Sequence, residues 1–112
     1  MRQDFAAADL TRLEAHLGSE PHCAVRAEMH GACIRLGGLH HIEPLMDLID
    51  NCSEDAAWNA LNTVQDLVER EPVANLVGFD QRIGATLAGL ARRIPLARKQ
   101  IDAILAELRG CR

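Results

Sequence analysis

The residues best suited to metal or nucleophile chemistry gather in one segment, residues 22–43, which holds four of the five histidines and two of the four cysteines. Zinc needs three or four converging ligands, and sequences that bind it usually show paired short spacings. Here only His30 and Cys33 are properly paired, and Cys33 also lies beside the apolar stripe of Met29 and Leu36. We therefore expect a core cysteine and surface histidines, with no metal site and no cofactor.

The rest of the chain contains no recognisable catalytic motif. It has no Gly-x-Ser-x-Gly, no His-Glu-x-x-His, no phosphate-binding loop and no Gly-x-Gly-x-x-Gly. Both serines, Ser19 and Ser53, precede stretches of helical periodicity, where a capping role accounts for them. The cysteines form no Cys-x-x-Cys pair, so we expect free thiols in a cytoplasmic protein. An enzyme is the least supported functional class.

Carboxylates are concentrated in the middle of the chain. The net charge is −4 over 112 residues, but residues 43–80 hold nine acidic residues and one arginine, whereas residues 81–112 are mainly basic. An acidic chain with three aromatic residues is a poor candidate for nucleic-acid binding, although the basic run at 91–100 could contact phosphates. The uneven distribution favours a field that steers a cationic partner.

Two amphipathic stretches, residues 41–50 and 54–70, carry most of these carboxylates. In the second, apolar residues at 57, 61, 64 and 68 predict a buried stripe, and the opposite face is acidic and amide-rich beside the only tryptophan. A solvated face usually mixes both charge signs, and tryptophan is a preferred interface anchor, although a lone tryptophan is more often buried. If the helices are neighbours, the two faces should merge into one partner-binding surface, formed by Glu43, Asp47, Asp50, Asp55, Trp58, Asn59, Asn62, Asp66 and Glu69.

Helical spacing of apolar residues continues along the whole chain, and no stretch alternates with period two. The pattern predicts a single all-α domain, residues 1–112, of six or seven short antiparallel helices. We expect them at about 5–17, 21–36, 41–50, 54–70, 72–77, 81–93 and 95–109. Short helices and short loops favour HEAT-like stacked hairpins over a compact helical bundle. No apolar run approaches 18 residues and no signal peptide is recognisable, so we expect neither a membrane span nor export.

The segment HHIEPLMDLIDNCSEDAAWNALNTVQDLVER, residues 40–70, resembles the small all-helical immunity proteins of bacterial toxin–immunity systems, including those of contact-dependent growth inhibition. The resemblance covers about residues 40–105 and rests on a helix of acidic–Trp–apolar–amide–acidic form after a short turn. Several members of that group are HEAT-like. They bind a cognate toxin domain, often a basic nuclease, and cover or distort its active site, so the resemblance implies an inhibitor without chemistry of its own.

Both lines of reasoning predict a cytoplasmic immunity-type inhibitor whose acidic helical surface binds a basic toxin domain. A carboxylate-rich surface can occupy positions where a nuclease expects phosphates, and its field raises the association rate. The alternative is a HEAT-like helical scaffold or adaptor that mediates protein–protein interaction. Neither hypothesis involves a direct contact with nucleic acid or membrane, and the oligomeric state stays open.

Overall fold

Seven α-helices and two short 3₁₀ helices form the computed structural model, which describes residues 2–110, and no strand occurs in this part of the chain. The first helices are α1 (Arg2–Leu17), α2 (Cys23–Arg35), the 3₁₀ helix η1 (Leu39–His41) and α3 (Ile42–Asn51). They are followed by α4 (Glu54–Arg70), α5 (Val73–Leu76), α6 (Asp80–Arg93), the 3₁₀ helix η2 (Pro95–Ala97) and α7 (Arg98–Gly110). The predicted all-α fold is confirmed.

The helix boundaries follow local chemistry. Ser53 caps α4, because its hydroxyl accepts a hydrogen bond from the backbone N–H of Ala56 at 3.3 Å. After the C-terminal end of α2, Gly37 adopts a φ of 99°, a backbone conformation that favours glycine. The next residue, Gly38, donates its N–H to the carbonyl of Cys33 at 2.9 Å and so closes the helix end. Phe79 occupies the capping position of α6, and Asp80 follows as its first residue, where a carboxylate is favoured by the helix dipole.

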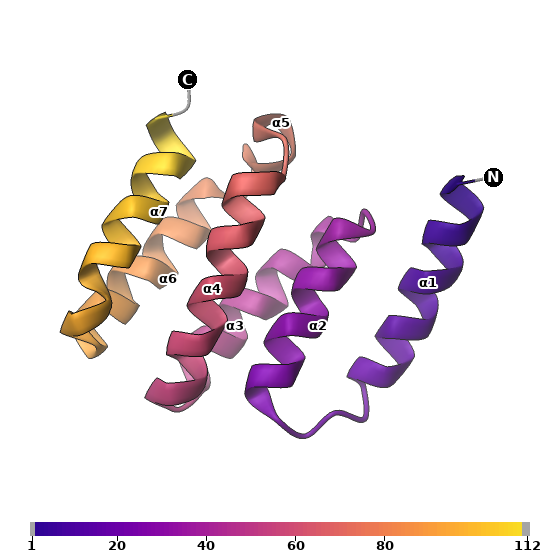
Figure 1. Cartoon of the computed structure of the whole chain (residues 1–112), viewed down its shortest axis with the longest axis horizontal. Coiled ribbons are helices and arrows are strands. Elements are labelled where there is room, and N and C mark those ends of the chain that lie inside the picture. Colours follow the sequence, from indigo (N-terminus) through magenta and orange to yellow (C-terminus); the bar gives the residue numbers. More distant parts are fainter. Residues whose placement is uncertain (1, 111–112) are drawn as a thin grey trace.

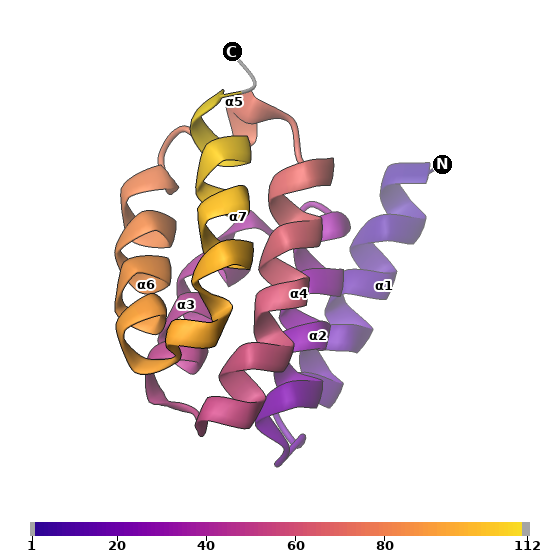
Figure 2. The ribbon, with the colours of Figure 1, turned by 60° about the vertical axis from the view of Figure 1, so that its left-hand side comes forward.

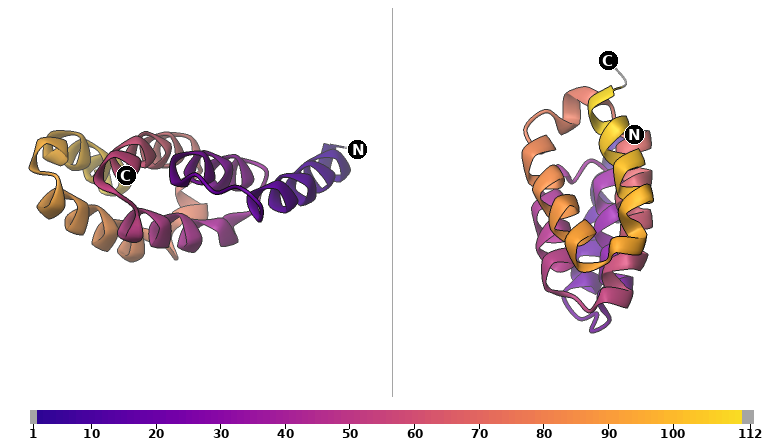
Figure 3. Two further views of the ribbon diagram at one scale, coloured as in Figure 1. Left: turned by 90° about the horizontal axis from the view of Figure 1, so that it is seen from below. Right: turned by 90° about the vertical axis from the view of Figure 1, so that its left-hand side faces the viewer.

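The helices pack in two layers. Figure 1 shows α2, α4 and α7 in front of α3 and α6, and the view from below in Figure 3 confirms that these sets form separate layers. Helix α1 extends the first layer beyond α2, while α6 and α7 close the opposite end (Figure 2). Two layers of helices about 10 Å apart, each helix with a Cα radius of about 2.3 Å, should be about 15 Å thick. The molecule extends 43, 36 and 17 Å along its principal axes, and the shortest of these agrees with two layers. The arrangement is that of stacked hairpins.

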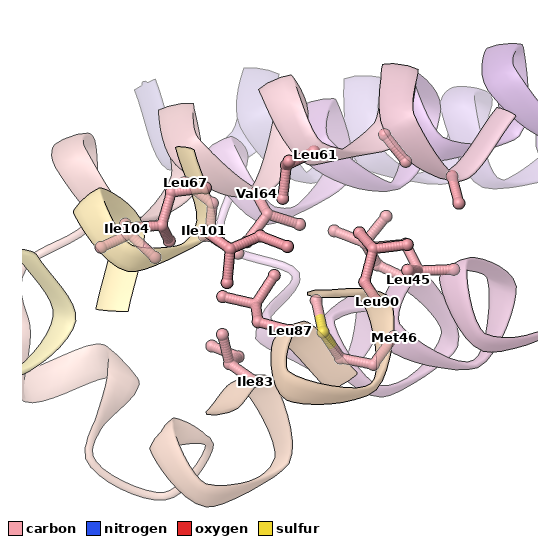
Figure 4. Packing of buried hydrophobic residues seen from close by; sticks show 14 of the residues in the cluster. Leu45, Met46, Leu61, Val64, Leu67, Ile83, Leu87, Leu90, Ile101 and Ile104 are labelled. Carbon is pink, nitrogen blue, oxygen red and sulfur yellow. The ribbon is translucent and has the colours of Figure 1, made fainter. Parts of the chain in front are cut away.

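The core lies between the layers and forms one continuous cluster. Leu61 and Val64 of α4 point toward Leu45 of α3 and Leu87 of α6, and all four side chains are fully buried (Figure 4). Removing a leucine of this size from water contributes about 1.5–3 kcal/mol. Because the core fills the space between the layers, the polar faces of the helices point outward. None of the described helices combines the length and the apolarity that a membrane crossing requires.

Candidate functional site

Helix α4 presents its polar face on the outer surface of the first layer. The four predicted core residues, at positions 57, 61, 64 and 68, are all buried, so the predicted orientation of the helix is confirmed. On the opposite face Asp55, Asn59, Asn62 and Glu69 are exposed, and Asp66 is half-buried. Trp58 is 37% exposed, and its indole lies at the border between the core and solvent.

Neighbouring helices restrain the C-terminal half of this face. Figure 1 places α4 between α2 and α7. The side chain of Gln100 in α7 donates to the amide oxygen of Asn62 at 2.9 Å, and Arg35 of α2 pairs with Asp66 at 3.3 Å. Asp66 also pairs with Arg70 at 2.6 Å, one turn along α4. This half of the face is therefore partly neutralised and held by hydrogen bonds.

The N-terminal half of α4 is different, because its carboxylates have no cationic partner among the side chains that the structure describes, those of residues 7–72 and 74–109. Glu54 and Asp55 are exposed and form no ion pair there, and Trp58 and Asn59 follow on the next turn. Carboxylates in the first turn of a helix are stabilised by the helix dipole, so the two negative charges cost little in the absence of a partner. Two of the three α4 carboxylates without an ion pair among the described side chains lie here, and the third is Glu69, which accepts a hydrogen bond from Gln65 at 3.4 Å.

The acidic residues of α3 do not join this surface. Arg82 of α6 lies among them and contacts Glu43 at 3.2 Å, Asp47 at 2.5 Å and Asp50 at 3.1 Å. Burial alone would lower the pKa of the Arg82 guanidinium, but its hydrogen bonds to these carboxylates outweigh burial and the pKa is raised. Because α3 and α4 belong to opposite layers, their outward faces point away from each other (Figure 3). The expected merging of the two acidic faces is wrong.

A second polar cluster, which the sequence did not predict, joins α1, α2 and η1. The Oε2 atom of Glu14 lies 2.5 Å from Nε2 of His41 and 2.8 Å from Nε2 of His40. These hydrogen bonds lower the pKa of the Glu14 carboxyl. On the other side of the buried His41 ring, Nδ1 lies 3.0 Å from Nδ1 of His30. Burial, together with the charges of His41 and Arg26, lowers the pKa of His30 to about 4, so this imidazole is neutral at pH 7.

The histidines therefore do not all lie on the surface, contrary to expectation, because His30 and His41 are buried. Cys33 is fully buried as predicted, and burial followed by the charge of Glu14 raises the pKa of its thiol. One pattern in the sequence indicates the cluster: a helix that carries His30 ends at two glycines, and His40 and His41 follow after that turn. Such a terminus turns the chain back toward its own helix.

Two further cysteines lie side by side at the start of α2 and the end of α3. Burial, and then the hydrogen bond to the thiol of Cys23, raise the pKa of Cys52 to about 11. Arg93 fixes this end of α3 by donating to the carbonyls of Ile49 and Cys52, both at 3.1 Å. Cys23, Cys33 and Cys52 are free thiols, as predicted, and Cys111 lies outside the described residues.

An apolar pocket of about 490 Å³ opens where α4, α5, α6 and α7 meet, and Val68, Leu76, Leu105 and Leu108 are among its lining residues. Figure 2 shows α5 beside the C-terminal end of α7, and these two helices contribute Leu76 and Leu108 to the pocket lining. The sequence gives no indication of this cavity, because a cavity depends on how the helix ends diverge.

Comparison with known proteins gives no relative for this chain. No family model, no curated protein and no solved structure matches it. The interpretation of the site therefore depends on its own chemistry.

Proposed function

We propose that the protein is an immunity-type inhibitor, which binds a cognate basic toxin domain in the cytoplasm through the outer face of α4. The observation that carries this proposal is the half-exposed Trp58, which sits among carboxylates and amides without a cationic partner within the described chain. The part of the Trp58 side chain that stays in contact with water costs free energy, and tryptophan is a preferred anchor when a partner covers it.

The charges support a basic partner and narrow the surface. Asp66 and the three carboxylates of α3 already have arginine partners, whereas the adjacent Glu54 and Asp55, and Glu69 alone at the other end of α4, have none among the described side chains. An incoming lysine or arginine would therefore find its strongest attraction at the N-terminal half of α4. The remaining acidic residues still contribute to the long-range field that accelerates the encounter. The centre of the proposed interface is formed by Asp55, Trp58, Asn59 and Asn62, with Glu69 at its rim.

The test begins with capture of partners by the tagged full chain from lysate of its own host, followed by mass spectrometry and direct binding of the partner found. We expect a partner with a basic domain. The double variant Asp55→Lys/Trp58→Ala should weaken its binding by 100-fold or more, since a central tryptophan and a charge reversal each cost about 2 kcal/mol or more.

The control is Asp102→Lys, which makes the same charge change at an exposed position of α7. It should alter binding less than about threefold, mainly through the association rate. Binding at wild-type strength by the α4 variant would contradict the proposed surface. An acidic partner, or a partner whose activity is unaffected by binding, would favour the scaffold or adaptor alternative.

A further inference from the structure

Three potential ligand atoms converge where α1 crosses η1. They are a carboxylate oxygen of Glu14 and the Nε2 atoms of His40 and His41, and all three lie within 4.8 Å of one another. The carboxylate reaches them from a helix more than twenty residues away in sequence, so the convergence is a product of the tertiary fold. Two imidazoles and one carboxylate form a donor set that Zn²⁺ prefers, in sites that leave a fourth position for water.

We propose that Glu14, His40 and His41 bind a divalent transition-metal ion, with Zn²⁺ as the best match. The donor set excludes Ca²⁺ and Mg²⁺ as preferred ions, because both favour oxygen ligands. The side chain of His40 is 67% exposed and that of Glu14 is 35% exposed, so an ion can reach the site from solvent. His41 is 8% exposed and forms the fixed inner wall.

His30 holds His41 in the orientation that metal binding needs. An ionised Glu14 can only accept, so in the metal-free protein both Nε2 atoms donate to it, and in the tautomer with one proton on each ring Nδ1 of His41 accepts from Nδ1 of His30. When Nε2 of His41 binds a metal, its proton moves to Nδ1 and is donated to Nδ1 of His30, whose own proton then resides on Nε2. Each ring keeps one proton, and the hydrogen bond persists with its direction reversed. Such a bond to the second ring nitrogen is usual for metal-binding histidines.

The three ligand atoms must reach tetrahedral spacing to admit the ion, which concerns the separation of the two Nε2 atoms, at most 4.8 Å, as well as their distances to Glu14. With bonds of about 2.0–2.1 Å in a tetrahedral arrangement, ligand atoms stand about 3.3 Å apart. The two distances from Glu14 to the histidines, 2.5 and 2.8 Å, must therefore lengthen by roughly 0.5–0.8 Å. His40 and Glu14 can supply this movement because both are partly exposed, while His41 stays in place. The ion would tie α1 to η1 at the end of the molecule where α1 has α2 as its main neighbour.

The test uses the full chain, stripped with a chelator and titrated with ZnCl₂ alone by isothermal calorimetry, and with CoCl₂ by absorption spectroscopy. We expect one equivalent of Zn²⁺ to bind, a rise in Tm, and visible cobalt bands typical of nitrogen and oxygen ligands. His40→Ala, an exposed position, should fold normally and lower the affinity at least tenfold. His30→Gln should lower it about 10–100-fold through the positioning of His41, with the cobalt bands shifted but present.

The matched control is His16→Ala, which removes another exposed histidine of α1 two residues from Glu14. It should leave affinity and stoichiometry unchanged. Equal loss in both alanine variants would assign the binding to scattered surface histidines and overturn the site, as would undiminished binding by His40→Ala. An intense near-ultraviolet cobalt band from thiolate would transfer the site to the cysteines and likewise refute the proposal. Absence of saturable binding at one equivalent would do the same.

Discussion

Arg82 is expected to stabilise the layer formed by α3 and α6, because it neutralises the carboxylates on the outward face of α3. Its guanidinium contacts Glu43, Asp47 and Asp50 and also donates to the hydroxyl of Thr86. The arginine side chain is 27% exposed and the carboxylates are 40–67% exposed. Exposed pairs contribute about 0.2–1 kcal/mol each, so three together should contribute roughly 1–2 kcal/mol, including the repulsion among carboxylates left without the arginine.

The variant Arg82→Met keeps most of the apolar stem and removes the charge. With a urea m-value of about 1.5 kcal/mol/M, the loss should lower the midpoint of unfolding by about 1 M. Salt of 1 M shortens the screening length to about 3 Å, so at least half of the difference from wild type should disappear there. Arg92→Met, an exposed arginine of the same helix, is the control and should shift the midpoint by less than half as much. If the two variants shift it equally, or if salt leaves the Arg82 effect intact, the stabilisation is packing and the electrostatic reasoning fails.

Three further results are expected. At pH 8 a thiol of pKa about 11 has roughly 200-fold less thiolate than an ordinary cysteine, and the higher nucleophilicity of its thiolate offsets about tenfold of this difference. Alkylation of Cys52, followed by peptide mapping, should therefore be about 20-fold slower than alkylation of a cysteine in a free peptide. The alkylation rate of Cys52 should rise with pH until about pH 11. A Cβ on Gly31 would meet Cγ2 of Thr63 at 2.6 Å, so Gly31→Ala should lower the free energy of unfolding in urea by about 1–3 kcal/mol. In a Thr63→Ser background, which lacks this methyl group, the same substitution should be neutral or stabilising. Identical effects in both backgrounds would contradict this close approach. Ser53→Ala should cost about 1 kcal/mol by loss of the cap of α4, whereas no change in midpoint would argue against that hydrogen bond.

The helices were predictable because their signals are local. The range 54–70 was predicted to the residue, since the capping serine, the apolar stripe and the following Glu71-Pro72 all lie within or beside the helix. The predicted range 21–36 begins two residues before α2, because Pro21 precedes the helix, which starts at Cys23. Similarly, Pro95 opens a separate 3₁₀ helix before α7. A proline indicates that a helix starts nearby, but the first residue of the helix depends on contacts with neighbouring segments.

The polar clusters were not predictable, because their members come from distant parts of the chain. Arg82 is separated from the carboxylates it neutralises by 32–39 residues. Helical spacing pairs His30 with Cys33, three residues away, whereas in the structure His30 faces His41 across the turn that contains Gly37 and Gly38. Spacing along one helix shows which residues share a face, and only packing shows what that face meets.

The fate of the acidic residues follows from this difference. Helices α3 and α4 carry the same kind of carboxylate row, yet the row on α3 lies beside α6, which supplies Arg82. The row on α4 lies between α2 and α7, which supply Arg35 and the neutral Gln100 and leave Asp55 without a partner among the described residues. A basic partner would gain little from α3, because it would have to displace an arginine already in place. It would gain most at the start of α4, where the negative charge is unopposed and Trp58 is partly uncovered.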